Sequence, residues 1–285
     1  MNKYIKLIVT IFILGIVFKI NDYSYSIDNL FVNKYIYLIF ISFFLLSIIF
    51  LSTRWLLLTT IIFKNKISFL YSILITFAAY AYNITIFGGV GDLSKFYYFQ
   101  RMNMAKVASL IFVERIIGLV TSLGLSTFVI INFYNIQLSI IFILIFFFIF
   151  TFLLKKKLLL KYLPYLNIVN YDVQKIILNN KIYLVIFISF LLHSIFYINH
   201  YFLIKFFGID ISFKQLLLIL AILSLANSFP FSYAGFGVRE LLILLFSSSI
   251  LTDIKNIFDF TLTLGLMNLI LGLLILSLLK FIKKY

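Results

Sequence analysis

Two acid–base pairs, Glu114-Arg115 and Arg239-Glu240, lie inside long apolar segments of the chain. A charge at the centre of a lipid bilayer costs at least about 2.5–3.5 kcal/mol unless it is paired. Adjacent residues of a helix do not face each other, so we expect Glu114 and Arg115 each to pair with another element. One interpretation is an inter-helix salt bridge that locks the fold. The other is a polar site in which Arg115 holds an anionic group and Glu114 balances the charge.

The second pair ends a stretch, Asn227–Glu240, that is unsuited to a regular membrane helix. Pro230 lacks a backbone donor and disfavours helical geometry at the residue before it. Gly235 and Gly237 permit backbone conformations that other residues resist. Irregular backbone at membrane depth is tolerated only where it is buried in protein or lines a water-filled cavity. We therefore predict a broken or re-entrant element whose acid–base pair lines a transport pathway.

A second glycine-rich stretch runs from Gly88 through Gly89 and Gly91 to Asp92, and it follows Asn83. It lacks the G-x-G-x-x-G spacing and the strand–helix context of a nucleotide-binding fingerprint. It is either an ordinary loop at a helix end or the tip of a helical hairpin. At a tip, its backbone N–H groups would begin the returning helix, and a helix N-terminus favours anions such as a lipid phosphate. Under the second interpretation, Asp92 also lines the pathway.

The composition places these pairs in a membrane protein. The chain has 285 residues, of which 64% are hydrophobic and only 12% charged, and its mean hydropathy is +1.16. The net charge of +15 comes from basic residues in short loops between apolar runs, which fits membrane topology rather than nucleic-acid binding. No cysteine is present, which excludes disulfides, thiol catalysis and cysteine metal sites. The residues predict no metal, no cofactor and no catalytic cluster.

Six full membrane-spanning helices are expected, one of them within residues 1–20 as an uncleaved first helix rather than a signal peptide. The other five cover residues 35–51, 107–131, 138–154, 182–204 and 260–279. The second span is expected to end at Arg54-Trp55, with Arg54 as an interfacial anchor. Residues 158–181 are mixed in character and fit an interfacial amphipathic segment.

The distribution of basic residues predicts the topology of the remaining segments. About seventeen of the 24 Lys and Arg residues fall on one side, which the positive-inside rule makes cytoplasmic together with both termini. Both flanks of residues 67–100 are then cytoplasmic and both flanks of 216–250 external, so each segment must enter and turn back. The units 35–131 and 182–280 become an inverted repeat, typical of transporters with a midplane site. We predict a single all-α polytopic domain, 1–285, whose two opposed hairpin tips approach each other near Glu114-Arg115.

The motifs resemble a known family. Gly88–Asp92, Glu114-Arg115 and Pro230–Glu240, with its Gly-x-Gly-x-Arg-Glu ending, are similar in type, order and spacing to motifs of the lysylphosphatidylglycerol synthase transmembrane-domain family, also called flippase-like or UPF0104. The resemblance covers essentially the whole chain. Two departures are Asp92, where glutamate is common, and the lack of a proline often found before the first glycine motif, and they concern the geometry of the first hairpin.

This resemblance implies lipid translocation. The best-known members carry an additional aminoacyl transferase domain. We expect no such domain in this chain, so the resemblance does not imply synthase activity. We expect a non-enzymatic flippase of the cytoplasmic (inner) cell membrane, acting on an anionic phospholipid or a polyprenyl-linked glycolipid in envelope or polysaccharide biogenesis. Homo-oligomers or partners in envelope biosynthesis are left open. The alternatives are a non-transporting scaffold of an envelope-assembly complex and a polyprenyl-dependent membrane glycosyltransferase, which the lack of an acidic cluster such as DxD disfavours.

Overall fold

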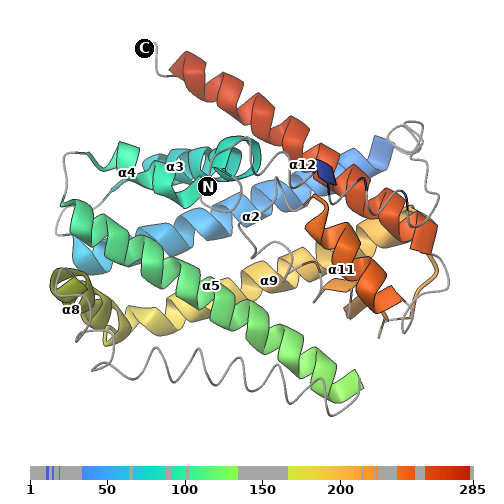
Figure 1. Ribbon diagram of the computed structural model, residues 1–285. Coiled ribbons are helices and arrows are strands. Elements are labelled where there is room, and N and C mark those ends of the chain that lie inside the picture. Colours follow the sequence, from blue (N-terminus) through green and yellow to red (C-terminus); the bar gives the residue numbers. More distant parts are fainter. Residues whose placement is uncertain are drawn as a thin grey trace. The chain divides into compact units, whose positions relative to one another are not determined.

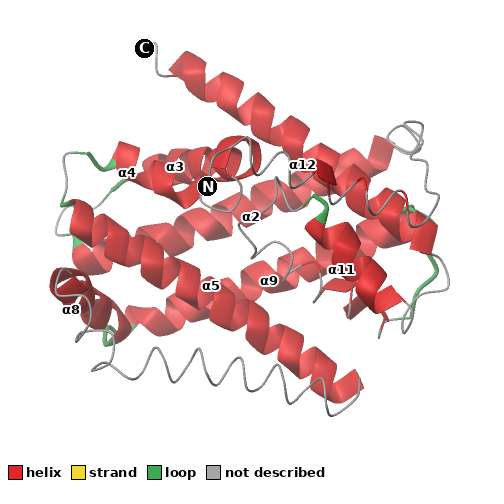
Figure 2. Cartoon of the chain, viewed as in Figure 1, coloured by secondary structure: helices red, strands yellow, loops and turns green. Residues whose placement is uncertain are grey.

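The computed structural model of the chain is helical throughout its described regular elements, with no strand among them (Figure 2). The described residues are 34–63, 67–87, 91–100, 103–133, 166–212, 236–247 and 254–282, with isolated positions at 11, 12, 15, 19, 215–217, 219, 220 and 223. The expected all-α class is confirmed for this part of the chain.

Four of the described helices are long, and Figure 1 labels each of them: α2 (Lys34–Ile62), α5 (Met104–Phe133), α9 (Lys181–Phe206) and α12 (Ile254–Ile282). A membrane-spanning helix needs about 20 predominantly apolar residues. Three stretches of the described chain are long and apolar enough to cross a membrane, namely Tyr35–Ile62, Lys181–Phe206 and Asn256–Lys280. The chain is therefore a membrane protein.

Shorter helical elements follow α2 in the segment that we predicted to turn back. The helix α3 (Phe69–Tyr82) continues directly into a π-helical turn, η2 (Asn83–Phe87). A 3₁₀ turn, η3 (Gly91–Ser94), leads into the single-turn helix α4 (Lys95–Tyr98). Single π turns inside helical segments are rare and frequently occur at functional sites.

Three contacts show that the chain reverses after η2. The backbone N–H of Gly91 donates to Oδ1 of Asn83 at 3.1 Å, and the α-carbon of Gly91 lies against the backbone of Ala79 and Asn83. Further along, the hydroxyl of Tyr71 donates to the carbonyl oxygen of Tyr98 at 2.7 Å. A side chain at position 91 would collide with the end of α3, so the reversal requires glycine there.

Two further helices are shorter and amphipathic. The helix α8 (Leu166–Ile177) packs along α5, lies within the segment that we expected to be interfacial, and buries Ile176 while Tyr171 stays exposed. The helix α11 (Val238–Ser247) begins immediately after the Gly-x-Gly motif. It forms most of the longest described stretch of the broken segment, residues 236–247.

The chain forms two compact units, each built from separate stretches of sequence. The first comprises Met1–Leu46, Phe77–Asp92 and Ile195–Tyr285, and the second comprises Ser47–Thr76 and Leu93–Ser194. In the first unit, Phe44 packs against Tyr80 with ring centroids 4.7 Å apart. The second unit has a core in which Trp55 meets Phe99 edge-on at 5.9 Å, surrounded by buried aliphatic side chains of α2, α5 and α9. Burial of this apolar surface stabilises each unit.

One predicted boundary is wrong. The second span was expected to end at Arg54-Trp55, but α2 continues unbroken to Ile62 because no glycine or proline interrupts it. The predicted helices at 1–20 and 138–154 lie outside the continuously described residues, as does most of 216–250. The inverted repeat, with its six spans and two re-entrant hairpins, remains a prediction.

Candidate functional site

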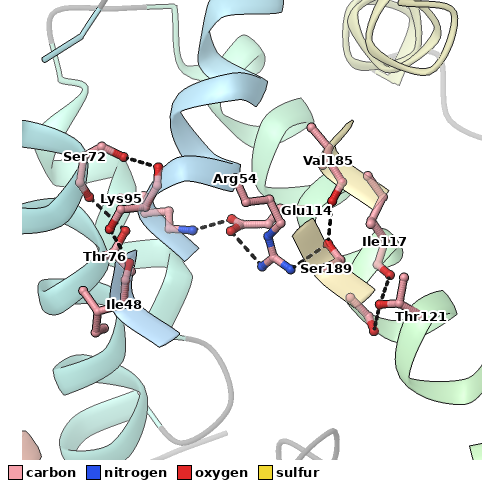
Figure 3. Close-up of polar contacts among 12 residues, drawn as sticks. Ile48, Arg54, Ser72, Thr76, Lys95, Glu114, Ile117, Thr121, Val185 and Ser189 are labelled. Carbon is pink, nitrogen blue, oxygen red and sulfur yellow. Dashed lines mark hydrogen bonds and ion pairs between the residues drawn. The ribbon is translucent and has the colours of Figure 1, made fainter. Parts of the chain in front are cut away.

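Glu114 lies at the centre of a buried ion-pair cluster in the second unit. Its side chain points inward from α5 and is 4% exposed. One carboxylate oxygen, Oε1, accepts from Nη2 of Arg54 at 3.0 Å, and the other, Oε2, accepts from Nζ of Lys95 (Figure 3). The expectation that Glu114 pairs with another element rather than with its neighbour is confirmed.

Arg54 is held in this cluster from a second side. Its Nη1 donates to the hydroxyl of Ser189 at 3.2 Å, and that hydroxyl donates to the carbonyl oxygen of Val185 at 2.9 Å. The side chain lies in the interior instead of reaching toward the lipid headgroups, because Glu114 compensates its charge there. We expected Arg54 to be an interfacial anchor because the predicted helix ended there. That expectation followed from the wrong boundary, since α2 continues to Ile62.

Lys95 is a member of the cluster that sequence reasoning missed. It begins α4, it is 3% exposed, and its Nζ lies 4.1 Å from the centroid of the Trp55 ring as well as against Glu114. An ammonium over an indole face is a favourable cation–π contact. The sequence spacing between Lys95 and Glu114 carries no signal that would reveal the pair. Together, the three charged side chains lock α2, α4 and α5 to one another.

The other predicted charged residues of this region lie differently. Arg115 is exposed on α5, although it neighbours Glu114 in sequence. Asp92 is partly buried in η3, at the first turn after the reversal. The described contacts assign neither residue to the cluster around Glu114, and their predicted roles in a pathway remain predictions.

The Gly-x-Gly-x-Arg-Glu motif forms the start of α11 in the first unit. Gly237 adopts φ = 82°, a left-handed conformation that favours glycine. Its backbone N–H donates to Oε2 of Glu240 at 2.7 Å, and its carbonyl accepts the first helical hydrogen bond, from Leu241, at 2.8 Å. A glutamate three residues into a helix that reaches back to the preceding N–H is half of a capping box. The motif is thus a helix-initiating device.

Arg239 occupies the second position of the same helix and is 2% exposed. Its Cζ lies 5.3 Å from the centroid of the Phe236 ring. Its Nε and Nη2, like Oε1 of Glu240, find no hydrogen-bond partner within the described protein. Buried polar atoms are almost always satisfied, so three unsatisfied atoms at one helix N-terminus make it a candidate site for a ligand.

One face of α12 was also missed. The hydroxyl of Tyr80 donates to Oδ1 of Asn268 at 2.7 Å, which places a polar contact inside an apolar helix. The spacing Gly265-x-x-Asn268-x-x-x-Gly272 was readable in the sequence as one helix face. A lone asparagine between two glycines in an apolar span was the available signal.

The remaining predicted tip residues divide into two groups. Asn83 and Gly91 are brought together at the reversal by their hydrogen bond. Five others lie outside the described residues: Gly88, Gly89, Asn227, Pro230 and Gly235. The expected approach of the two glycine-rich tips therefore remains a prediction.

Comparison with protein families agrees with these motifs. The family model for the lysylphosphatidylglycerol synthase TM region matches residues 4–251, which include the first glycine-rich motif, Glu114-Arg115 and Arg239-Glu240. Neither curated proteins nor solved structures give a significant match. The match covers most of the chain, and the protein accordingly belongs to the family of the lysylphosphatidylglycerol synthase TM region.

Proposed function

We propose that the protein is a lipid flippase of the cytoplasmic membrane, which moves an anionic phospholipid or a polyprenyl-linked glycolipid between leaflets in envelope or polysaccharide biogenesis. Membership of the flippase-like family and the apolar spans support this proposal at the level of class. The observation that carries it further is Arg239, a buried cation with two unsatisfied nitrogens at the start of a helix.

The chemistry of Arg239 suits a lipid phosphate. A guanidinium presents several N–H donors in a fixed fork, which matches the oxygens of a phosphate. The N-terminus of α11 adds the positive end of the helix dipole on the same side. An anion bound there would satisfy Nε and Nη2 of Arg239 and would offset the cost of burying the cation.

Glu240 adds an acceptor beside this donor. Its Oε2 is committed to the backbone of Gly237, whereas Oε1 has no partner in the described residues. A headgroup that carries both a phosphate and a hydrogen-bond donor, such as a hydroxyl or an amine, would satisfy Arg239 and Glu240 together. Both proposed lipid classes include headgroups of this kind, and their tails would remain in the bilayer.

The rest of the proposed pathway uses the predicted topology. With both termini cytoplasmic, the first hairpin would open to the cytoplasm and the broken segment with Arg239 to the outside. Arg115, exposed on α5, would offer a further contact for an anionic headgroup, and Asp92 would lie on the route at the first hairpin. Glu114 would act at a distance, by holding the helices that frame the route.

A leaflet-exchange assay tests the proposal. The protein would be reconstituted in vesicles with fluorescent phosphatidylglycerol, aminoacylated phosphatidylglycerol or polyprenyl phosphate, and exchange would be followed by quenching of the outer leaflet. We expect the wild type to exchange at least one of these lipids, and Arg239→Met to slow exchange at least tenfold. Lys205→Gln is the matched control, because Lys205 is an exposed cation paired only with the exposed Asp210 in the described structure. Absence of exchange above Arg239→Met for every lipid would overturn the proposal.

A non-transporting scaffold is the second candidate, and the Arg54–Glu114–Lys95 cluster favours it, because its two ion pairs join α2, α4 and α5 to one another. The same assay separates the two. A scaffold gives no exchange with the wild type, whereas a flippase gives exchange that depends on Arg239.

A further inference from the structure

The last described helix, α12, presents a face that contacts both the Gly-x-Gly-x-Arg-Glu motif and the η2 turn. Gly265, Asn268 and Gly272 are spaced three and four residues apart and lie on one side of the helix. We call these three residues the α12 seat. The family match ends at residue 251, before α12 begins at Ile254, so nothing in that match assigns a role to this helix.

Arg239 rests on the first residue of the seat. A methyl group built on Gly265 would lie 2.5 Å from Nη2 of Arg239 and 2.5 Å from Cε1 and Cζ of Phe236. Real side-chain carbons do not approach other atoms so closely. The stacked guanidinium and ring of these two residues therefore occupy the volume that any larger residue at 265 would need.

The centre of the seat is tied to α3 by hydrogen bonds. Asn268 accepts from the hydroxyl of Tyr80 at 2.7 Å, and its Nδ2 donates to the carbonyl oxygen of Leu264 at 2.8 Å. The second bond fixes the orientation of the amide, so that Oδ1 faces Tyr80. This partly buried hydrogen bond between side chains lies in an apolar region, so it favours one arrangement of the two helices over others that would leave these polar groups unpaired.

The π turn rests on the third residue. A methyl group built on Gly272 would lie 3.1 Å from Cγ2 of Thr85 and 3.5 Å from Cγ2 of Ile84. This approach is tight but less severe than the one at Gly265. The turn η2 thus lies against α12 seven residues beyond the contact with Arg239, a rise of about 10 Å along a helix axis.

We infer that the α12 seat is a positioning element of the transport site, which holds the guanidinium of Arg239 and the η2 turn at a fixed spacing along one rigid helix. Gly265 lets Arg239 and Phe236 approach, Asn268 sets the register of α3, and Gly272 accommodates η2. The role of the seat in transport rests on the proposed flippase function, whereas its contacts with Arg239, Tyr80 and η2 do not. The seat fixes where the guanidinium of Arg239 lies relative to the η2 turn, which directly precedes the first glycine-rich motif.

Cysteine cross-linking tests the geometry without any transport assay. The chain contains no cysteine, so Thr85→Cys with Gly272→Cys introduces a single pair. We expect this pair to form a disulfide readily in native membranes under mild oxidation. The control pair, Thr85→Cys with Ser277→Cys, places the second thiol at an exposed position on the same helix. Equal cross-linking of the two pairs would contradict the contact between η2 and α12 at Gly272, whatever the protein transports.

Substitution at the seat tests its role in transport. We expect Gly265→Ala to raise the half-saturating lipid concentration and slow exchange at least tenfold, and Gly272→Ala to have a smaller effect. Gly124→Ala is the matched control, because nothing outside its own helix lies within 4 Å of the added methyl group. Phe236→Ala combined with Gly265→Ala should restore part of the exchange by removing the ring that the methyl group meets.

The outcomes separate the two proposals. Unchanged exchange in Gly265→Ala, or no rescue by Phe236→Ala in a protein that is folded by size-exclusion chromatography, would overturn the positioning role while leaving the flippase intact. Absence of exchange in the wild type, together with disulfide formation in the Thr85→Cys, Gly272→Cys variant, would overturn the proposed function while leaving the seat as a structural feature.

Discussion

Two glutamates, each beside an arginine in sequence, are buried in this protein with opposite consequences. Glu114 receives Arg54 and Lys95 from other helices, while its neighbour Arg115 is exposed. Glu240 uses one oxygen to cap its own helix at Gly237. Its neighbour Arg239 is buried against α12 with two nitrogens unsatisfied in the described residues.

The difference teaches that the partner, rather than burial alone, decides what a charged residue does. A carboxylate that meets two cations from distant helices holds those helices together, and removing it leaves uncompensated charge. A carboxylate that caps its own helix leaves the adjacent cation available to a ligand. The cluster around Glu114 is accordingly a lock, and the start of α11 is the better candidate for binding.

The strongest test of the lock is Glu114→Gln. The substitution keeps the shape of the side chain but leaves Arg54 and Lys95 buried without a counter-charge, so it should lower the free energy of unfolding by about 3–5 kcal/mol. The measurement is equilibrium unfolding in mixed detergent micelles. Asp210→Asn breaks an exposed pair and should change the value by less than about 1 kcal/mol. Equal stability of the two variants would show that Glu114 is not a lock.

A test of the second region is Gly237→Ala. The φ of 82° at Gly237 strains any residue with a Cβ atom, so the variant should lose about 1–2 kcal/mol. The same unfolding experiment measures it against Gly124→Ala, which lies within α5 and should gain about 0.5–1 kcal/mol. A stable Gly237→Ala protein would contradict the helix-initiating geometry assigned to the motif.

The smallest effect is expected for Glu240→Gln, and it sharpens the comparison with Glu114 directly. Glutamine can still accept from the N–H of Gly237, so the loss should stay within about 0.3–1 kcal/mol, the value of a charge at a helix N-terminus. Glu240→Gln should be measured in a protein that also carries Arg239→Met, with the Arg239→Met single variant as its reference. The loss of the counter-charge of Arg239 then does not contribute to the difference in free energy. A loss as large as that of Glu114→Gln would remove the distinction between lock and cap.

Much of the helical framework was predictable from the chain. Long apolar segments predict α2, α9 and α12, because a bilayer demands such lengths and hydrogen-bonded helices satisfy their own backbone. The expectation for Arg54 failed because a charge was assumed to mark the end of a helix. In the structure, α2 continues past it, since Glu114 supplies the counter-charge from sixty positions away.

The candidate site was predictable in its residues and not in its contacts. Arg239 and Glu240 stand out as charges in an apolar segment, and the Gly-x-Gly pattern before them signals a break. Sequence spacing alone does not show that Glu240 caps while Arg239 remains unsatisfied. It also did not reveal Lys95, which only the reversal after η2 brings to Glu114.

The sequence by itself determined that this is an all-helical membrane protein with charged residues inside its apolar segments, because hydropathy and charge are local properties of the chain. The tertiary structure alone decided which charges are paired, since pairing depends on contacts between different elements, such as those from Arg54 and Lys95 to Glu114. In an apolar interior, each such contact decides whether a buried charge is compensated within the fold.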